Sequence, residues 1–273
     1  MLSERKKVDD GGKMDYCFTV DDNIRAFAAV AQKGCASLFE HPYFAMLLRL
    51  HRAHGVKVQL NMFYQREGFT LAEMPERYRA EFAANADWLR LSFHSKDETR
   101  WPYKTAGYGE VKADCLAVQR EILRFAGEGS LAKTTTIHFC ELTEDGVRAM
   151  RDAGVIGLLG LYGTRGAERV SYSIRDRAIS DRLREGEAVS ALGLWHGGID
   201  IVMNNFDAEG ILSQLDGLKE RKSVRVMIHE QFFYEDYAAY QPDFEEKLSR
   251  AFAALRAQGR ESRFFEEMIG DRA

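Results

Sequence analysis

Short apolar runs alternate with amphipathic stretches along most of this chain. The apolar runs have the length and alternation of buried strands, whereas the amphipathic stretches have helical periodicity. The pattern predicts strands at 15–20, 56–64, 88–94, 133–139, 155–163, 200–205 and 223–229, and helices at 39–55, 71–86, 111–127, 143–154 and 242–259. Strands that alternate with helices are typical of βαβ units and a mostly parallel sheet.

Residues at the predicted helix ends support several of these assignments. Gly55 and Gly127 follow two helices as expected C-caps. Thr143 precedes a helix with acidic residues in its first turn, which is typical of an N-cap. The last helix carries Pro242 at its start and Gly259 at its end.

About seven strand–helix repeats over 273 residues favour a closed or nearly closed barrel over an open sheet. The fold class predicted is therefore α/β, a distorted (β/α)7–8 barrel with mostly parallel strands. The Gly-rich segment 160–200 is irregular, and we expect a hairpin or a lid over the barrel mouth there. No linker or low-complexity tract divides the chain, so residues 1–273 are predicted to form one domain with its core at about 15–268.

Composition and charge limit the kinds of partner and the cellular compartment that we expect. A net charge of -4 leaves no basic excess to neutralise phosphates, which argues against a nucleic-acid partner. No segment approaches the roughly 20 apolar residues of a membrane span, and residues 1–16 lack the apolar stretch of a signal peptide. The four cysteines form no C-x-x-C pair and are expected to be buried thiols. We therefore expect a cytoplasmic protein with a small-molecule or carbohydrate substrate, and leave a homo-oligomer open.

The sharpest chemical feature is the pair Asp21–Asp22 directly after an apolar strand. Catalytic residues of parallel α/β folds lie where strands end and loops begin. Two adjacent carboxylates repel each other, and on a strand they face opposite ways. A divalent ion bound by one of them would leave the other free as a base. Asp-Asp-Asn is also favourable turn chemistry, so the dipeptide alone leaves both readings open.

Histidines at two other predicted strand ends extend this set. His94 and Glu98 lie four residues apart, and both would face one ion if the loop between them is helical. His229 ends the last strand, and Glu230 beside it could bind metal, orient His229 or form an ordinary ion pair. A structural histidine explains His94 or His229 equally well when each is taken alone.

Taken in order, these segments resemble the polysaccharide deacetylase (NodB-like) superfamily, whose fold is a distorted (β/α) barrel. Residues 19–22, Thr-Val-Asp-Asp, resemble the family's Thr-Phe-Asp-Asp motif, in which the first Asp is the general base and the second a metal ligand. Residues 94–98 resemble its His-Ser/Thr-x-x-His motif, which supplies two further ligands. Residues 227–229 are similar to the late hydrophobic-His motif, which supplies the general acid.

The chain departs from the family pattern in ways that indicate a divergent branch. Glu98 stands where the family has its second metal histidine, and an Asp-His-Glu site would be harder and more anionic. The arginine motif occurs at Arg100, directly after the second motif and earlier than in the family. His138 on the fourth strand could therefore take over as a ligand or a substrate contact, and Asp200 could orient the late histidine.

The resemblance implies a metal-dependent hydrolase with one divalent ion, zinc foremost, with iron, manganese, cobalt or nickel as alternatives. The implied reaction is deacetylation of an N-acetylated sugar or sugar-containing precursor through a metal-bound water. The implied roles are general base for Asp21, general acid for His229, metal binding for Asp22, His94 and Glu98, and substrate binding or support for Arg100, His138, Asp200 and Glu230. Two alternatives stay open: hydrolysis of a small cyclic or linear amide on the same barrel, and a catalytically silent carbohydrate-binding barrel.

Overall fold

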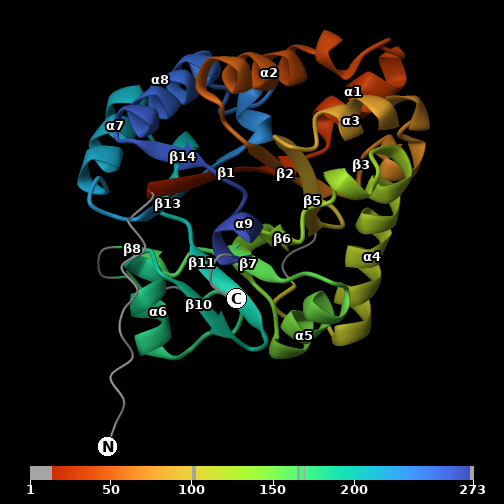
Figure 1. Cartoon of the computed structure of the whole chain (residues 1–273). Helices are drawn as coiled ribbons and strands as arrows, with labels where there is room; N and C mark the ends of the chain where they lie inside the picture. Colours follow the sequence, from red (N-terminus) through yellow and green to blue (C-terminus); the bar gives the residue numbers. More distant parts are fainter. Residues whose placement is uncertain (1–13, 100–102, 165–166, 169, 271–273) are drawn as a thin grey trace, which may run out of the picture.

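The computed structural model describes residues 14–99, 103–164, 167–168 and 170–270 (Figure 1). The strands are β1 (Met14–Asn23), β2 (Val58–Phe63), β3 (Gln65–Arg66), β4 (Phe69–Thr70), β5 (Leu89–Ser95), β6 (Thr134–Thr135), β7 (Gly157–Gly160), β8 (Gly163–Thr164), β9 (Ala167–Glu168), β10 (Ala188–Ala191), β11 (Leu194–Gly198), β12 (Ile201–Val202), β13 (Ser223–His229) and β14 (Arg260–Ser262). The helices are α1 (Arg25–Lys33), α2 (Pro42–His54), α3 (Arg79–Ala84), α4 (Tyr108–Phe125), α5 (Glu144–Asp152), α6 (Arg177–Arg184), α7 (Ala208–Gly217), α8 (Phe244–Ala257) and α9 (Phe265–Gly270). Short 3-10 turns include η2 (Leu71–Glu73), η3 (Glu76–Tyr78), η5 (His138–Cys140), η6 (Met203–Asn205) and η7 (Glu230–Phe233).

Two mostly parallel sheets form the centre of the molecule. The larger has the order β12-β13-β1-β2-β5, with β14 paired to the start of β1, and the smaller has the order β10-β11-β7-β6. Within these two sheets the pairings are parallel, except that β10 runs antiparallel to β11. Around the centre the main strands follow their order in the chain, as they do in a (β/α) barrel. The predicted fold class, α/β with a distorted and mostly parallel barrel, is confirmed.

The barrel is distorted because its backbone ladder is divided between the two sheets. Between β5 and β6, one parallel bridge joins Leu91 to Leu131. At the other junction, Ile199 N donates to Gly160 O at 2.8 Å and Asp200 N donates to Arg225 O at 2.8 Å. Ordinary barrel pairing is thus reduced to a few bonds at two places.

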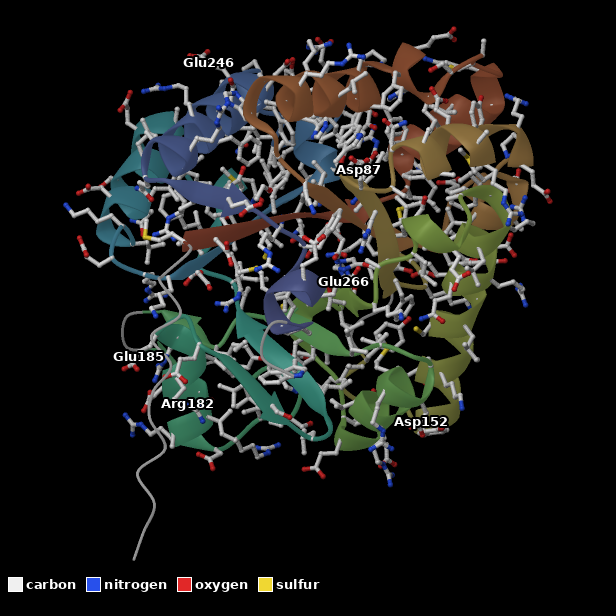
Figure 2. The ribbon with its side chains drawn as sticks, in the orientation of Figure 1. Asp87, Asp152, Arg182, Glu185, Glu246 and Glu266 are labelled. Atoms are coloured by element: carbon white, nitrogen blue, oxygen red, sulfur yellow. The ribbon has the colours of Figure 1, made fainter. Side chains whose placement is uncertain are left out.

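Helix α9 closes one end of this barrel. Its Phe265, Met268 and Ile269 form a buried cluster with side chains from β1 and β7. At Gly197 of β11, a Cβ would lie 2.8 Å from the Phe265 ring, so only glycine allows this approach. Glu266, near the middle of Figure 2, accepts from Lys133 N at 2.6 Å and pairs with Arg90, which bridges the β5–β6 junction.

Helices pack around the outside of the sheets (Figure 1). Helices α2, α7 and α8 lie together along the larger sheet, and α4 packs against α5 and β5. Gly55 ends α2 as predicted, in the left-handed conformation, with its N–H bonded to His51 O. Thr143 caps α5 as predicted, and its hydroxyl accepts from Gly146 N. None of the helices in the described ranges is both long and apolar enough to cross a bilayer.

Several predicted elements differ from the structure. The helix predicted over 71–86 is divided into η2, η3 and the short α3, because Pro75 has no N–H and forces Met74 into an extended conformation. The strand predicted over 133–139 pairs at Thr134–Thr135 and then turns sharply. Helices α1 and α7 lie in segments for which the sequence pattern predicts no element.

The irregular segment 160–200 contains the antiparallel hairpin β10–β11 and helix α6. The hairpin does not cover a barrel mouth. Instead β11 pairs in parallel with β7 and becomes a barrel strand. Residues 165–166 and 169 of this segment lie outside the described residues.

Candidate active site

The end of β1 is bent where the two adjacent aspartates lie. Asp22 has a left-handed backbone with φ 64°, and the pairing of β1 with β2 shifts register between Val20 and Asn23. A regular strand would send Asp21 and Asp22 to opposite faces. Because the bend interrupts this alternation, both carboxyl groups are buried beside the same histidines.

Asp22, His94 and His138 form a buried group in which each residue offers one ligand atom, all within 4.8 Å of one another. His94 Nε2 lies 3.0 Å from Asp22 Oδ1, and His138 Nδ1 lies 3.3 Å from the same oxygen. The two ring nitrogens are 3.2 Å apart. Gln231 Nε2 donates to the other Asp22 oxygen at 2.7 Å and so fixes the direction of the carboxylate.

The donor set of this group fits a divalent cation. His94 Nδ1 lies 2.5 Å from Thr136 O, which accepts its proton, so Nε2 is the nitrogen directed at Asp22 and the one that would bind a cation after losing its own proton. His138 Nε2 is buried without a hydrogen-bond partner among the described residues, which leaves Nδ1 as the nitrogen directed at Asp22. Two imidazole nitrogens and one carboxylate are a common ligand set for zinc and similar ions.

Charges and hydrogen bonds within this group shift the pKa values of Asp22 and His94. Burial raises the pKa of Asp22, but the hydrogen bonds with His138 and His94 outweigh it and hold the pKa well below its ordinary value. Burial lowers the pKa of His94, yet the carboxylates of Asp21 and Asp22 outweigh it and raise the pKa overall. The carboxylate of Asp22 is therefore kept ionised, as a metal ligand must be.

His138 reaches this group through a strained turn. Phe139 and Cys140, which follow it in η5, have φ 60° and φ 57°. Two hydrogen bonds of Tyr172 hold this turn in place. Tyr172 Oη accepts from Ile137 N at 3.2 Å, and Tyr172 N donates to Cys140 O at 3.2 Å. The turn thus depends on a segment some thirty residues further along the chain.

Asp21 lies beside the group but is not a member of it. Its Oδ1 accepts from Asn61 Nδ2 at 2.6 Å, and Asn61 Oδ1 accepts in turn from Ser92 Oγ and from Gln59 Nε2. Burial raises the pKa of Asp21, against the opposing effect of His94 and His229. A raised pKa brings a carboxylate closer to the range in which a general base works at neutral pH.

His229 ends β13 and is the direct register partner of Asp21 on β1. Its Nδ1 lies 2.8 Å from Asn204 Oδ1, an acceptor, so Nδ1 carries the proton that makes this bond. The remaining nitrogen, Nε2, is then available for proton transfer. Gln241 Nε2 donates to Asn204 O at 2.8 Å and holds η6 in place.

Asp200 does not orient His229, which corrects that prediction. It precedes β12, which runs parallel to β13, so Asp200 lies near the start of β13 whereas His229 lies at its end. Its carboxylate accepts from Arg221 at 2.5 Å and from Arg225 N at 2.8 Å. Asp200 is therefore a structural residue at the end of the barrel away from the site.

Glu230 has a structural role in the site rather than a direct one. Its buried carboxylate accepts from the backbone N–H groups of Ile24, Arg25 and Ala26 at 2.7–2.9 Å, and from Tyr234 Oη at 2.8 Å. It caps α1, the helix that begins directly after the aspartate pair.

The structure does not bring Glu98 to the group formed by Asp22 and His94. The prediction assumed a helical loop after β5, but residues 96–99 form a bend and a turn, and Glu98 is exposed. His138, the alternative considered from the sequence, lies there instead. Arg100 lies outside the described residues.

Three amide side chains of the site are absent from the residues predicted from the sequence. Asn61, Asn204 and Gln231 position Asp21, His229 and Asp22 respectively. Asn61 stands within an apolar strand, where a buried amide needs a polar partner. That position was the one hint available from the sequence.

A cleft of about 800 Å³ opens onto the site. Asp22, Phe63 and Gln231 lie on its wall, opposite residues of the β3–β4 hairpin and the loop after β5. Tyr237 and Phe69 also line it, and Glu98 lies at the same cleft rather than at the buried group. The cleft is large enough for a small sugar or another polar molecule of similar size.

No family model matches the sequence, and no curated protein matches it either. Several solved structures share the fold at low identity. The 4-alpha-glucanotransferase from Thermococcus litoralis aligns with a TM-score of 0.62 at 12% identity, over 95% of this chain. The chain spans only 40% of that enzyme's length.

Two deacylating enzymes align over nearly their whole length. A peptidoglycan N-acetylglucosamine deacetylase gives a TM-score of 0.56 at 10% identity, with 94% of this chain and 88% of the other covered. A family 4 acetyl xylan esterase from Clostridium thermocellum, solved with a cobalt ion, gives 0.53 at 12% identity, with 93% and 90% covered. A Bacillus anthracis pseudoenzyme of the same esterase family also aligns, with a TM-score of 0.52.

These similarities establish the fold and leave the reaction to be argued from the site. The chain shares its fold with these two enzymes, as the resemblance of its motifs predicts, at sequence identities of 10% and 12%.

Proposed function

We propose that the protein is a metal-dependent amide hydrolase that deacetylates an N-acetylated sugar or a sugar-containing precursor. The observation that carries this proposal is the buried group Asp22–His94–His138 on the wall of a cleft, with Asp21 and His229 beside it. The set provides three ligands, a separate carboxylate and a separate imidazole. Amide hydrolysis at a metal requires these same parts.

The site residues have two kinds of proposed role: metal ligand, and proton donor or acceptor. Asp22 Oδ1, His94 Nε2 and His138 Nδ1 would hold one divalent ion, which would polarise the amide carbonyl and lower the pKa of a bound water. Asp21, held by Asn61, would accept the proton of the attacking water. His229, with its Nδ1–H held by Asn204 and a second proton on Nε2, would donate the Nε2 proton to the leaving nitrogen.

A His-His-Asp ligand set favours zinc among the divalent ions, with iron, manganese, cobalt or nickel as competitors. With His138 in place of Glu98 the ligand set has one negative charge instead of two. The harder and more anionic Asp-His-Glu site inferred from the sequence is therefore no longer our expectation.

The intact Asp21 and His229 favour an enzyme over a silent sugar-binding barrel. Both are fixed by buried or half-buried amides that a binding protein would have no need to retain. A small cyclic or linear amide remains a second candidate substrate class, because the cleft would also accept one.

Measuring the metal content of variants tests whether His138, rather than Glu98, is a metal ligand. Protein purified without added metal or chelator is compared as wild type, His138→Ala and Glu98→Ala, with Asp22→Ala as the reference for a lost site. We expect about one equivalent of metal in wild type and Glu98→Ala, and a loss of at least tenfold in affinity in His138→Ala and Asp22→Ala. Each variant is then assayed for acetate release from a panel of N-acetylated sugars.

Two results would count against the proposal. Metal retained in His138→Ala but lost in Glu98→Ala would reverse the ligand assignment. Wild-type protein that takes up no metal after reconstitution would remove the hydrolase mechanism and favour the silent barrel.

A further inference from the structure

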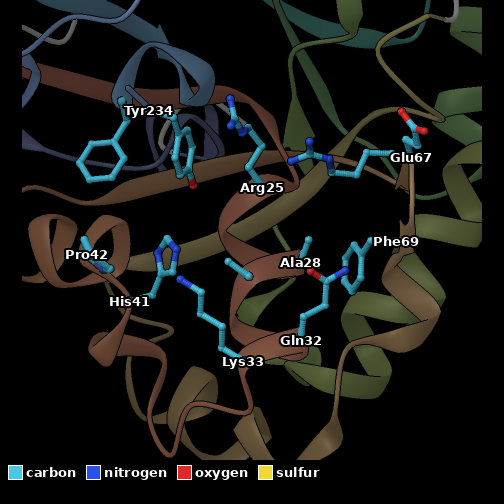
Figure 3. A pocket seen from close by; sticks show the side chains of 12 residues that line it. Arg25, Ala28, Gln32, Lys33, His41, Pro42, Glu67, Phe69 and Tyr234 are labelled. Atoms are coloured by element: carbon cyan, nitrogen blue, oxygen red, sulfur yellow. The ribbon is translucent and has the colours of Figure 1, made fainter. Parts of the chain in front are cut away.

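A second hollow of about 480 Å³ adjoins the cleft (Figure 3). It shares Arg25, Arg66, Glu67 and Phe69 with the cleft wall. The rest of this side pocket comes from α1, the start of α2 and η7, through Ala28, Ala29, Gln32, Lys33, His41, Pro42, Phe233 and Tyr234. None of the residues to which the proposed function assigns a catalytic or metal-binding role lines it.

The charged residues of the side pocket are mostly cationic. Arg25, Lys33 and Arg66 line it, against the single carboxylate of Glu67. Arg25 is engaged, since it pairs with Asp236 at 2.5 Å and lies 4.2 Å over the Tyr234 ring. Lys33 and Arg66 form no ion pair with any described residue. The pocket thus presents two cations that make no ion pair among the described residues, although the charge of Arg66 helps to lower the pKa of Asp236.

Two uncharged side chains with N–H groups, His41 and Gln32, line the pocket beside these cations. His41 Nδ1 accepts from Tyr43 N at 3.3 Å, so a neutral ring carries its proton on Nε2. Burial, and then the nearby Lys33, lower the pKa of His41 to about 4, which keeps the ring neutral at physiological pH. Figure 3 shows the Lys33 side chain extended toward His41, with Gln32 on the opposite side.

We propose that the side pocket binds an oxyanion, a phosphate or a carboxylate, carried by the substrate whose amide lies at Asp22. Arg66 offers a planar fork and Lys33 a point charge, the two ways in which proteins bind such groups. The two hollows share four wall residues, so they lie close enough for one extended molecule to reach both. The substrate part of this assignment rests on the proposed function, whereas binding of the anion itself does not.

Binding of inorganic phosphate to the full chain, followed by ³¹P NMR titration, tests the pocket without any activity. Lys33→Gln and Arg66→Gln are compared with wild type, and Lys222→Gln serves as the matched control. Lys222 is exposed and lies at the start of β13, away from the site. We expect saturable binding in wild type and Lys222→Gln, weakened about tenfold in the two pocket variants.

Asp22→Asn separates the side pocket from the proposed metal site. Phosphate binding that survives in Asp22→Asn and falls in Lys33→Gln supports the pocket. Binding lost in Asp22→Asn but unchanged in Lys33→Gln would overturn the proposal, because phosphate would then occupy the site around Asp22. Absence of saturable binding in wild type would overturn it as well.

Paired substrates test where the anion comes from. N-acetylated mono- and disaccharides are assayed with and without a phosphate ester. We expect kcat/KM to favour the phosphorylated member about tenfold in wild type and Lys222→Gln, and by less than about twofold in Lys33→Gln. Equal rates for both members in wild type would overturn the substrate assignment and leave a site for free phosphate. If no sugar is deacetylated, the proposed function fails while the titration still decides the pocket.

Discussion

Asp22 combines a proposed ligand role with a strained backbone. A non-glycine residue in the left-handed region costs on the order of 1 kcal/mol, and such strain persists only where the surroundings enforce it. Gln231 and the two histidines hold its carboxylate. His138 also precedes two left-handed residues, Phe139 and Cys140. Two of the three proposed ligands therefore depend on unusual backbone geometry.

Tyr172 is predicted to position His138 without touching it. Tyr172→Phe would remove the acceptor of Ile137 N and leave a buried N–H unpaired, which costs about 1–3 kcal/mol of folding free energy. Because the turn would relax, we also expect metal affinity to fall about tenfold. Urea unfolding and a competitive metal titration measure the two effects.

Tyr162→Phe is the matched control for this variant. Tyr162 is also buried, but its hydroxyl bonds His196 rather than the 137–140 turn. We expect it to lose stability and keep its metal affinity. Equal metal affinity in both variants would mean that Tyr172 contributes only to packing.

Sequence reasoning found the site residues that follow apolar strands. Asp21, Asp22, His94 and His229 were recognisable because each is a polar residue at the end of such a strand, in an order that resembles a known family. The choice between Glu98 and His138 was not decidable, because it depends on a non-helical loop and on a turn held from residue 172. Single amides such as Asn204 carry no periodic signal at all.

At the scale of elements, α1 begins directly after the aspartate pair because its cap comes from elsewhere. The residue at its N-cap position, Ile24, has no side chain that could cap it. The carboxylate of Glu230 accepts three N–H groups of the first turn instead. The start of α1, and with it the end of β1, is thus fixed by the loop after β13.

Glu230→Gln should loosen this junction. The carboxamide keeps the shape but turns an N–H₂ group toward backbone donors, so we expect a loss of about 2 kcal/mol in the free energy of unfolding. Metal affinity should fall as well, because Asp22 is two residues from Ile24. Urea unfolding and metal titration are the measurements. Glu235→Gln, on the same loop but exposed, should change neither, and a similar loss in both would contradict the capping role.

Element boundaries followed the sequence where local chemistry decides them. Gly55 and Thr143 end and begin their helices as predicted, since a left-handed cap and a hydroxyl cap are local devices. The start of α1 could not be predicted, because its cap lies about 200 residues away. The prediction of one helix over 71–86 was wrong, because Pro75 interrupts the helix that the apolar periodicity of this segment indicates.

At the scale of the whole molecule, the residues of the proposed active site and a group of interacting charged residues lie at opposite ends of the barrel. The strand ends carry Asp22 and His229, whereas Asp200, Arg221 and Arg225 interact near the start of β13. Phe265 of α9 packs at that same end. Substitutions there should therefore change stability more than metal binding.

At the scale of the whole molecule, the titration of His196 should make the free energy of unfolding fall as the pH falls from about 6.5 toward 5. Buried His196 accepts from Tyr162 Oη at Nδ1 and donates to Ala191 O from Nε2, and burial lowers its pKa from 6.5 to about 4. Between these two values the unfolded chain binds one proton more than the folded chain, so acid favours unfolding by about 1.4 kcal/mol per pH unit, or roughly 2 kcal/mol by pH 5. His196→Gln should flatten the slope of unfolding free energy against pH by about that amount, whatever its stability at pH 7.5. His54→Gln, a change at a half-buried histidine, should keep most of the slope. Identical slopes for wild type and His196→Gln would show that His196 does not stay neutral in the folded protein.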